Sequence, residues 1–295
     1  MDRAALDKQY NLRQAVLGHL DDFARWRRMS DAARAALPHR ADLAYGGHPL
    51  ETLDFFSVPQ PGRPLIVFIH GGYWQAMDKA DFSFAAMGFA SEAAGHRANV
   101  AVINYPLAPA VRMDRIAAAN RRALLWLWRN AAELGADPGR IYAMGHSAGG
   151  HLVADAALAD WRALAPAAPQ NLLRGGLAIS GLFDLRPIQQ CYLNDGLRMD
   201  QPEAERNSPL LRLPFAPRPL VPMALAVGER ETDAFHEQQS VFAQAYHAAG
   251  GEVMAITEPH RHHFDILDGL GRAEGSPPDG LRGAMLRLIE QSGDE

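Results

Sequence analysis

Short apolar segments alternate with longer segments of helical periodicity from residue 53 onward. Six apolar segments have the composition of buried strands: residues 65–69, 100–103, 141–144, 177–179, 223–227 and 253–256. Several are almost entirely apolar, which is typical of strands covered on both faces. Four longer segments have the apolar spacing of helices: residues 82–94, 115–134, 148–158 and 234–249. This order predicts an α/β fold with a mostly parallel central sheet flanked by helices.

Three stretches depart from the alternation. Residues 1–45 are polar and helix-prone and carry no strand signal, which predicts an N-terminal helical appendage to a main domain at residues 46–295. Residues 181–222 contain seven prolines, which break any long periodic element and indicate a loop-rich insertion or small cap over the site. The Pro and Gly content of residues 271–280 predicts a loop before a final helix.

Composition and charge narrow the classes of function. The 295 residues, 48% of them hydrophobic, suffice for one large core. A formal net charge of -5 provides no basic field for nucleic acid or anionic membranes, so we expect a small-molecule substrate, neutral or zwitterionic. Cys191 is the only cysteine, and no apolar stretch approaches the ~20 residues that span a bilayer. We therefore expect a soluble, cytoplasmic protein with no membrane contact, and the sequence leaves open whether it forms a homodimer.

The strongest chemical signal is the sequence GHSAGG at residues 145–150, between a predicted strand and a predicted helix. A GxSxG sequence in this setting is typical of a nucleophile elbow, whose sharp turn lifts a serine hydroxyl above the sheet. The glycines are needed because a side chain at either position would crowd the turn. Ser147 is therefore the predicted nucleophile of an α/β-hydrolase fold, and an ordinary Gly/Ser turn is the alternative.

A second signal follows the predicted strand at residues 65–69, which leads into the sequence HGGYW at residues 70–74. Acyl transfer places negative charge on the carbonyl oxygen, and backbone N–H groups aimed at that charge stabilise it. In this fold one N–H comes from the residue after the nucleophile, here Ala148, and another from the loop after an early strand. We assign the second N–H to Gly72 and name Tyr73 as a candidate third donor of the oxyanion hole.

The acid and the histidine of a catalytic triad follow the nucleophile along the chain in this fold, each after a late strand. The strand at residues 223–227 leads to three carboxylates: Glu229, Glu231 and Asp233. The strand at residues 253–256 leads to three histidines: His260, His262 and His263. In a triad the histidine moves the serine proton, and the acid orients the histidine. A zinc site in the histidine cluster is the alternative, but the spacing matches no standard ligand set, so we expect no metal.

At these residues the chain resembles the arylformamidase (kynurenine formamidase) group of the esterase and lipase hydrolases. HGGYWQ at residues 70–75 is similar to the group's HGGxW oxyanion motif, and GHSAGGH at residues 145–151 is similar to its nucleophile motif. Further similar segments lie elsewhere in the chain: QYN at 9–11, AYG at 44–46, GLFDL at 181–185 and NSP at 207–209. The resemblance spans most of the chain.

The resemblance implies a role for individual residues. It implies His263 as the base, because His263 and the residues after it are similar to the group's HFxI segment. It implies Glu231 as the acid, where many relatives carry aspartate, and Asp233 stays as the alternative acid. The implied reaction is hydrolysis of N-formyl-L-kynurenine to L-kynurenine and formate without a cofactor. Trp74 and Phe183 are candidate walls for the aromatic ring of the substrate, with plain core packing as the alternative.

Two other functions fit parts of the sequence. A carboxylesterase, aryl amidase or carbamate hydrolase would use the same machinery on another small aryl ester or amide. A protein of this fold that only binds its ligand normally lacks the nucleophile or the base, and candidates for both are present here. The sequence therefore predicts a serine hydrolase, with arylformamidase as its first expected activity.

Overall fold

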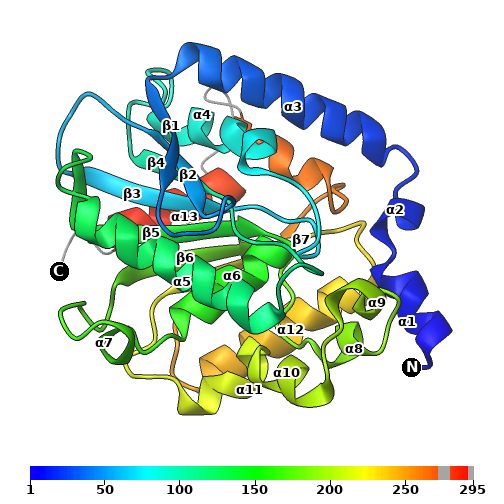
Figure 1. Ribbon diagram of the computed structural model, residues 1–295. Helices are drawn as coiled ribbons and strands as arrows, with labels where there is room; N and C mark the ends of the chain where they lie inside the picture. The colour runs from blue at the N-terminus through cyan, green and yellow to red at the C-terminus, as the bar shows by residue number, and fades with distance from the viewer. Residues whose placement is uncertain (272–279, 292–295) are drawn as a thin grey trace.

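Within the residues that the computed structural model describes, 1–271 and 280–291, eight strands form one sheet (Figure 1). Along the chain the strands are β1 (His39–Ala44), β2 (Thr52–Phe56), β3 (Arg63–Ile69), β4 (Asn99–Ile103), β5 (Ala136–His146), β6 (Leu173–Ile179), β7 (Met223–Gly228) and β8 (Val253–Glu258). Across the sheet the order is β1-β2-β4-β3-β5-β6-β7-β8. The β1–β2 and β2–β4 pairs are antiparallel, and the other five pairs are parallel. The mostly parallel sheet predicted from the sequence is confirmed.

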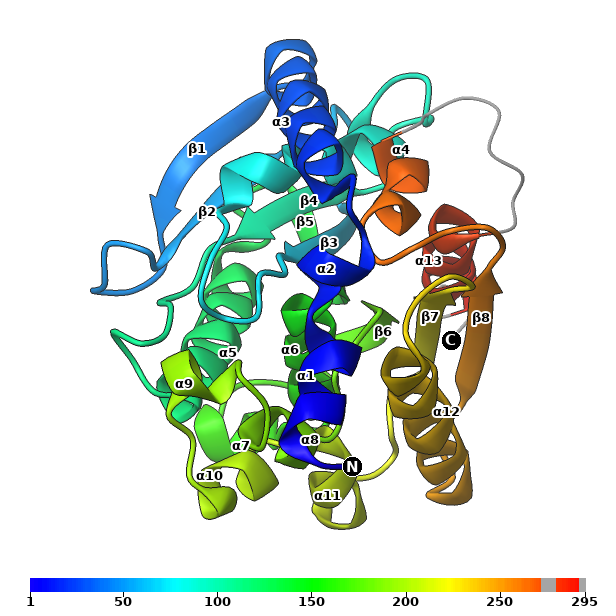
Figure 2. The ribbon, with the colours of Figure 1, turned by 90° about the vertical axis from the view of Figure 1, so that its right-hand side faces the viewer.

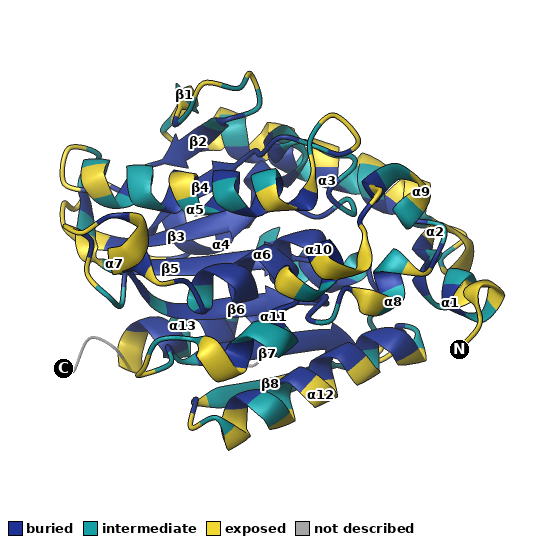
Figure 3. Cartoon of the chain, turned by 60° about the horizontal axis from the view of Figure 1, so that its bottom comes forward, coloured by how far each residue is buried: buried dark blue, intermediate teal, exposed yellow. Residues whose placement is uncertain are grey.

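Helices cover both faces of the sheet. Outside the insertion they are α1 (Arg3–Tyr10), α2 (Leu12–Ala15), α3 (His19–Ala36), α4 (Met87–Ala90), α5 (Met113–Asn130), α6 (Ala148–Ala157), α7 (Trp161–Leu164), α12 (Asp233–Ala248), α13 (Leu281–Gln291) and the 3-10 helices η1 (Lys79–Ala86) and η3 (Asp265–Gly271). Helices α5, α6 and α12 cover one face, while α4 and α13 cover the other (Figure 3). Strands β4 and β7 are buried along their whole length, which explains their almost entirely apolar sequences.

The structure contains all six predicted strands, and it adds two that the sequence analysis did not predict. The prediction that residues 1–45 contain no strand is wrong, because β1 pairs with β2 at the edge of the sheet. Strand β1 is mostly exposed or half-buried, so it lacks the apolar run that marks a covered strand. Strand β2 carries a buried carboxylate, Asp54, which pairs with Lys79 at 2.8 Å and interrupts its apolar sequence. The helix predicted at residues 82–94 is instead η1 followed by α4.

The N-terminal helices pack onto the rest of the chain. Figure 2 shows α1 and α2 passing in front of the sheet, with α3 continuing above them. Trp26 of α3 is buried, and its ring lies 5.2 Å from that of Phe82 and 6.1 Å from that of Phe264. The predicted helical character of this segment is confirmed, and its aromatic side chains belong to the core of the whole molecule.

The proline-rich insertion consists of short helices joined by turns. Its elements are α8 (Arg186–Gln189), α9 (Asn194–Leu197), α10 (Gln201–Arg206), α11 (Pro209–Arg212) and the 3-10 helix η2 (Leu213–Phe215). The insertion contacts α1, where the N–H of Tyr192 donates to Asp7 at 2.7 Å. The final helix predicted from the sequence is α13, and residues 272–279 of the loop predicted before it lie outside the described residues. Among the described helices, none combines the length and apolar character needed to cross a bilayer.

Candidate active site

The parallel register of the sheet brings together the residues that follow its strands. Ile69 at the end of β3 lies opposite Gly145 near the end of β5, and Gly145 lies opposite Ala178 of β6. The carboxyl ends of parallel strands form one edge of a sheet, and ligands commonly bind outside that edge. Ser147 follows β5 at this edge, as His263 follows β8.

The turn at Ser147 has the strained backbone of a nucleophile elbow. Ser147 has φ 57° and ψ -117°, a conformation that an L-residue rarely adopts, and its N–H donates to the Ile179 carbonyl at 2.8 Å. The two motif glycines are required by close packing. A Cβ on Gly149 would lie 2.0 Å from the Ile69 carbonyl oxygen, and a Cβ on Gly145 would lie 2.5 Å from the Gly149 carbonyl oxygen. The sequence analysis predicted that a side chain at either glycine would crowd the turn. The atoms that such a side chain would meet are main-chain carbonyl oxygens.

Gly149→Ala should lower the free energy of unfolding by about 1–3 kcal/mol, because the added methyl group must displace the end of β3. We expect the Tm to fall by several degrees, and activity to fall with it, since α6 carries the N–H of Ala148. Differential scanning calorimetry measures the first effect. Gly47→Ala is the matched control, because a Cβ at this exposed position would have no heavy atom within 4 Å. Equal Tm values for the two variants would contradict the packing argument.

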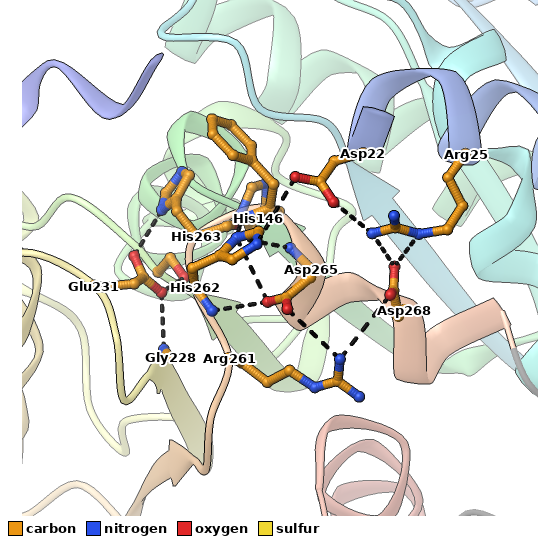
Figure 4. Close-up of polar contacts among 12 residues, drawn as sticks. Asp22, Arg25, His146, Gly228, Glu231, Arg261, His262, His263, Asp265 and Asp268 are labelled. Atoms are coloured by element: carbon orange, nitrogen blue, oxygen red, sulfur yellow. Dashed lines mark hydrogen bonds and ion pairs between the residues drawn. The ribbon is translucent and has the colours of Figure 1, made fainter. Parts of the chain in front are cut away.

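A buried hydrogen-bonded pair joins the loops after β7 and β8. Glu231 Oε2 lies 2.6 Å from Nδ1 of His263, and both side chains are almost completely buried (Figure 4). The other carboxylate oxygen accepts the hydroxyl of Ser180 at 2.6 Å and the N–H of Gly228 at 2.8 Å. Because the carboxylate accepts at Nδ1, the neutral imidazole carries its proton there and leaves Nε2 as an acceptor. His263 thus has the tautomer that a general base requires.

The other acids and histidines considered from the sequence lie outside this pair. Asp233 is exposed at the first position of α12. Glu229 and His260 are exposed and contact each other, with 3.1 Å between Oε2 and Nδ1. His262 is half-buried and accepts the N–H of Asp265 at Nδ1, 3.3 Å away. The geometry therefore favours Glu231 and His263 among the candidates.

The loop after β3 turns back on itself directly beside the elbow. Gly72, Tyr73 and Trp74 have φ values of 102°, 50° and 57°. A Cβ on Gly72 would lie 2.2 Å from the Ala76 carbonyl oxygen, so only glycine fits at this position. Within the described part of the chain, the N–H groups of Gly72, Tyr73 and Ala148 donate to no protein acceptor. These N–H groups are therefore not used by another group of the described chain, and Gly72 and Tyr73 line the cavity beside Ser147.

His146 is a buried site residue that the sequence analysis did not single out. Burial, and then the neighbouring His263, holds the pKa of His146 well below its usual value, so the ring is neutral. Its Nε2 donates to the His263 carbonyl at 2.8 Å, which links the elbow to the segment that carries the base. Its Nδ1 is an acceptor with no partner among the described residues. The sequence feature that could have identified His146 is its position in the GxSxG motif, directly before Ser147.

An aromatic cavity of about 500 Å³ opens onto these residues. Ser147, His263, Gly72 and Tyr73 all contribute to its lining. Its remaining lining residues come from the N-terminal segment, the loop after β3, the elbow, the insertion and the segment after β8: Asn11, Leu12, Arg13, Phe23, Trp26, Gln75, Ala76, Met77, His146, Tyr192, Leu193 and Phe264. Four segments distant in sequence therefore close one cavity around the elbow.

Trp74 and Phe183, expected as walls for an aromatic ring, do not line this cavity. The Trp74 ring is fully buried edge-on against His151, with 5.1 Å between ring centroids. The Phe183 ring stacks on Phe242 at 4.3 Å. Both side chains pack in the core, which was the alternative considered from the sequence. The rings that do line the cavity come from Phe23, Trp26, Tyr73, Tyr192 and Phe264.

Comparisons with known proteins agree with this architecture. A family described as "alpha/beta hydrolase fold" matches residues 66–265. Kynurenine formamidase of Danio rerio is 29% identical and covers 82% of this chain and 80% of its own length. Esterase LipQ of Mycobacterium tuberculosis is 27% identical, covering 78% of this chain and 59% of its own. The solved structure of a candidate thioesterase from Silicibacter sp. tm1040 has a TM-score of 0.79 and 29% identity, covering 97% of this chain and 98% of its own. The resemblance to kynurenine formamidases expected from the motifs is confirmed over most of the chain.

Proposed function

The chain belongs to the α/β-hydrolase fold family and is a hydrolase, and on that premise we propose that it is an arylformamidase that cleaves N-formyl-L-kynurenine. The observation that carries the proposal is the buried His263–Glu231 pair, whose histidine lines the same aromatic cavity as Ser147. The similarity to kynurenine formamidases supports the choice of substrate. We assign Ser147 as nucleophile, His263 as general base and Glu231 as the acid that orients it.

In the first half of the reaction, the Ser147 hydroxyl attacks the formyl carbon while His263 Nε2 takes its proton. The resulting imidazolium is stabilised by the Glu231 carboxylate, whose other oxygen accepts hydrogen bonds from Ser180 and Gly228 and is held in place by them. His263 then gives the proton to the aryl amine as its bond to the formyl carbon breaks. L-kynurenine leaves, and a formyl ester remains on Ser147.

In the second half, water attacks the formyl ester with His263 again as base, and formate is released as Ser147 regains its proton. Each half passes through a tetrahedral oxyanion. We assign its stabilisation to the N–H groups of Gly72 and Ala148, with Tyr73 as the third donor, because no protein acceptor competes for them in the described chain. The cycle consumes only water, so the proposed reaction uses no cofactor.

The cavity lining supports a small acyl group and an aromatic leaving group. Five aromatic rings line the cavity, and such rings stack favourably on an aryl amine. Tyr73 is held in place because its hydroxyl donates to the Tyr10 carbonyl at 2.8 Å. We therefore expect this fixed ring beside the proposed oxyanion site to disfavour long acyl chains.

A substrate panel tests this assignment. We expect kcat/KM for N-formylkynurenine to exceed that for phenyl acetate. Among phenyl esters we expect kcat/KM to fall about tenfold from acetate to butyrate, because the longer acyl chain meets the Tyr73 ring. Steady-state kinetics on the purified protein measure both ratios. Rapid turnover of aryl esters with N-formylkynurenine left intact would exclude the formamidase and keep the hydrolase.

An aryl esterase is the second candidate, and the similarity to an esterase of Mycobacterium tuberculosis supports it. The triad and oxyanion donors would act in the same way on an ester, whose alcohol leaves more readily than an amine. The same substrate panel separates the two activities, since it contains both an aryl formamide and aryl esters.

A cytoplasmic location and a homodimeric state, both raised by the sequence, stay predictions. Light scattering on the purified protein would measure its oligomeric state. Fractionation of cells that produce the protein would measure its location.

A further inference from the structure

We propose that Arg13 binds a carboxylate group of the substrate at the active-site cavity. The proposal rests on the proposed function, because it takes the cavity beside Ser147 as the place where substrate binds. It adds the residue that recognises the carboxylate of N-formyl-L-kynurenine, which lies on the leaving-group side of the scissile bond.

The first argument is the charge of the cavity lining. Arg13 is exposed and contributes to the lining, which includes no other arginine, no lysine and no carboxylate. Of the two histidines in the lining, His146 is neutral because burial lowers its pKa. The whole chain has a formal net charge of -5, so it does not attract anions from a distance. A carboxylate that enters this cavity therefore depends on a local cation, and Arg13 is the one the lining supplies.

The second argument is that Arg13 is unpaired. Nearby arginines of α3 have carboxylate partners: Arg25 contacts Asp22 and Asp268, and Arg27 contacts Asp81. In the part of the chain that the structure describes, Arg13 makes no ion pair and no hydrogen bond. A guanidinium group offers paired N–H donors in the geometry that a carboxylate accepts. The donors of Arg13 are free for that purpose.

The third argument is that the backbone at Arg13 is fixed relative to the reacting centre. Just before it, the Tyr10 carbonyl accepts the hydroxyl of Tyr73, in the loop of the proposed oxyanion hole. The Gln9 carbonyl accepts the hydroxyl of Thr232, next to Glu231, at 2.8 Å. The main chain just before Arg13 is therefore attached to both sides of the site, which limits where the Arg13 side chain can reach into the cavity.

Two aryl esters that differ in one carboxylate test the proposal: phenyl acetate and 4-acetoxyphenylacetate. In the wild-type protein we expect a higher kcat/KM for the charged ester. In Arg13→Gln the ratio of kcat/KM between charged and neutral ester should fall about tenfold, mainly through KM, because a charge-assisted contact to a group distant from the reaction is lost. Arg13→Lys should keep part of the preference, and 0.5 M NaCl should reduce it in the wild type.

Arg28→Gln is the matched control, since Arg28 is also exposed and lies outside the cavity lining. It removes the same charge from the protein and should leave the ratio of the two esters within twofold of the wild-type value. An equal fall in Arg28→Gln, or an equal change for both esters in Arg13→Gln, would overturn the carboxylate site. Because the test uses esters, it remains valid for a hydrolase that leaves N-formylkynurenine intact, so the failure of the proposed function and the failure of this proposal can be told apart.

Discussion

Ser147→Ala should lower kcat by roughly a million-fold while the protein stays folded, because no other group can form the covalent acyl intermediate. The substitution removes one buried oxygen atom and keeps the Cβ that the turn already accommodates. The N–H of Ser147, which donates to the Ile179 carbonyl, is also retained. The measurement is the hydrolysis rate of N-formylkynurenine and phenyl acetate, with the Tm as a check on folding.

Covalent labelling provides an independent test of the same residue. A phosphonate or sulfonyl fluoride should modify the wild-type protein on Ser147, as mass spectrometry of its peptides would show, and it should leave Ser147→Ala unmodified. A folded Ser147→Ala protein with wild-type turnover would contradict the entire catalytic assignment.

Glu231→Gln should lower kcat by about 10⁴-fold, because it forces the wrong tautomer on the base. The main-chain N–H of Gly228 donates to one carboxylate oxygen, so it would face the amide oxygen of a glutamine. The amide NH₂ would then face Nδ1 of His263, which would have to accept a hydrogen bond and move its proton to Nε2. An imidazole protonated at Nε2 cannot take the proton of Ser147.

Asp233→Asn is the control for Glu231→Gln, because it makes the same chemical change two residues away on an exposed side chain. Its expected effect on kcat is less than twofold, with a loss of about 0.3–1 kcal/mol in stability from the first turn of α12. If Asp233→Asn proved severe and Glu231→Gln mild, the acid would have to be reassigned to Asp233.

Local patterns were enough to predict the framework of this protein. The strands from β3 to β8 each leave a short apolar run in the sequence, and GxSxG marks the turn at Ser147 because only glycines fit against the adjoining backbone. Strand β1 has no such mark. It is an exposed edge strand. It is held in place by its pairing with β2, and burial of its side chains contributes little.

Relations between distant residues needed the tertiary structure. Three carboxylates and three histidines stand at the right points of the chain, and spacing alone leaves nine pairings open. The hydrogen bond between Glu231 and His263 joins residues 32 positions apart, and it depends on the directions of two loops that no periodicity reports.

Contacts between segments distant in sequence also determine which residues line the cavity. Trp74 is next to the proposed oxyanion donors in sequence, yet its ring turns into the core, while Trp26 and Arg13 from the N-terminal segment line the cavity. A strand or a sharp turn depends on interactions within a few residues, so its sequence reveals it. A cavity depends on which distant segments pack side by side, and that is settled only when the whole chain has folded.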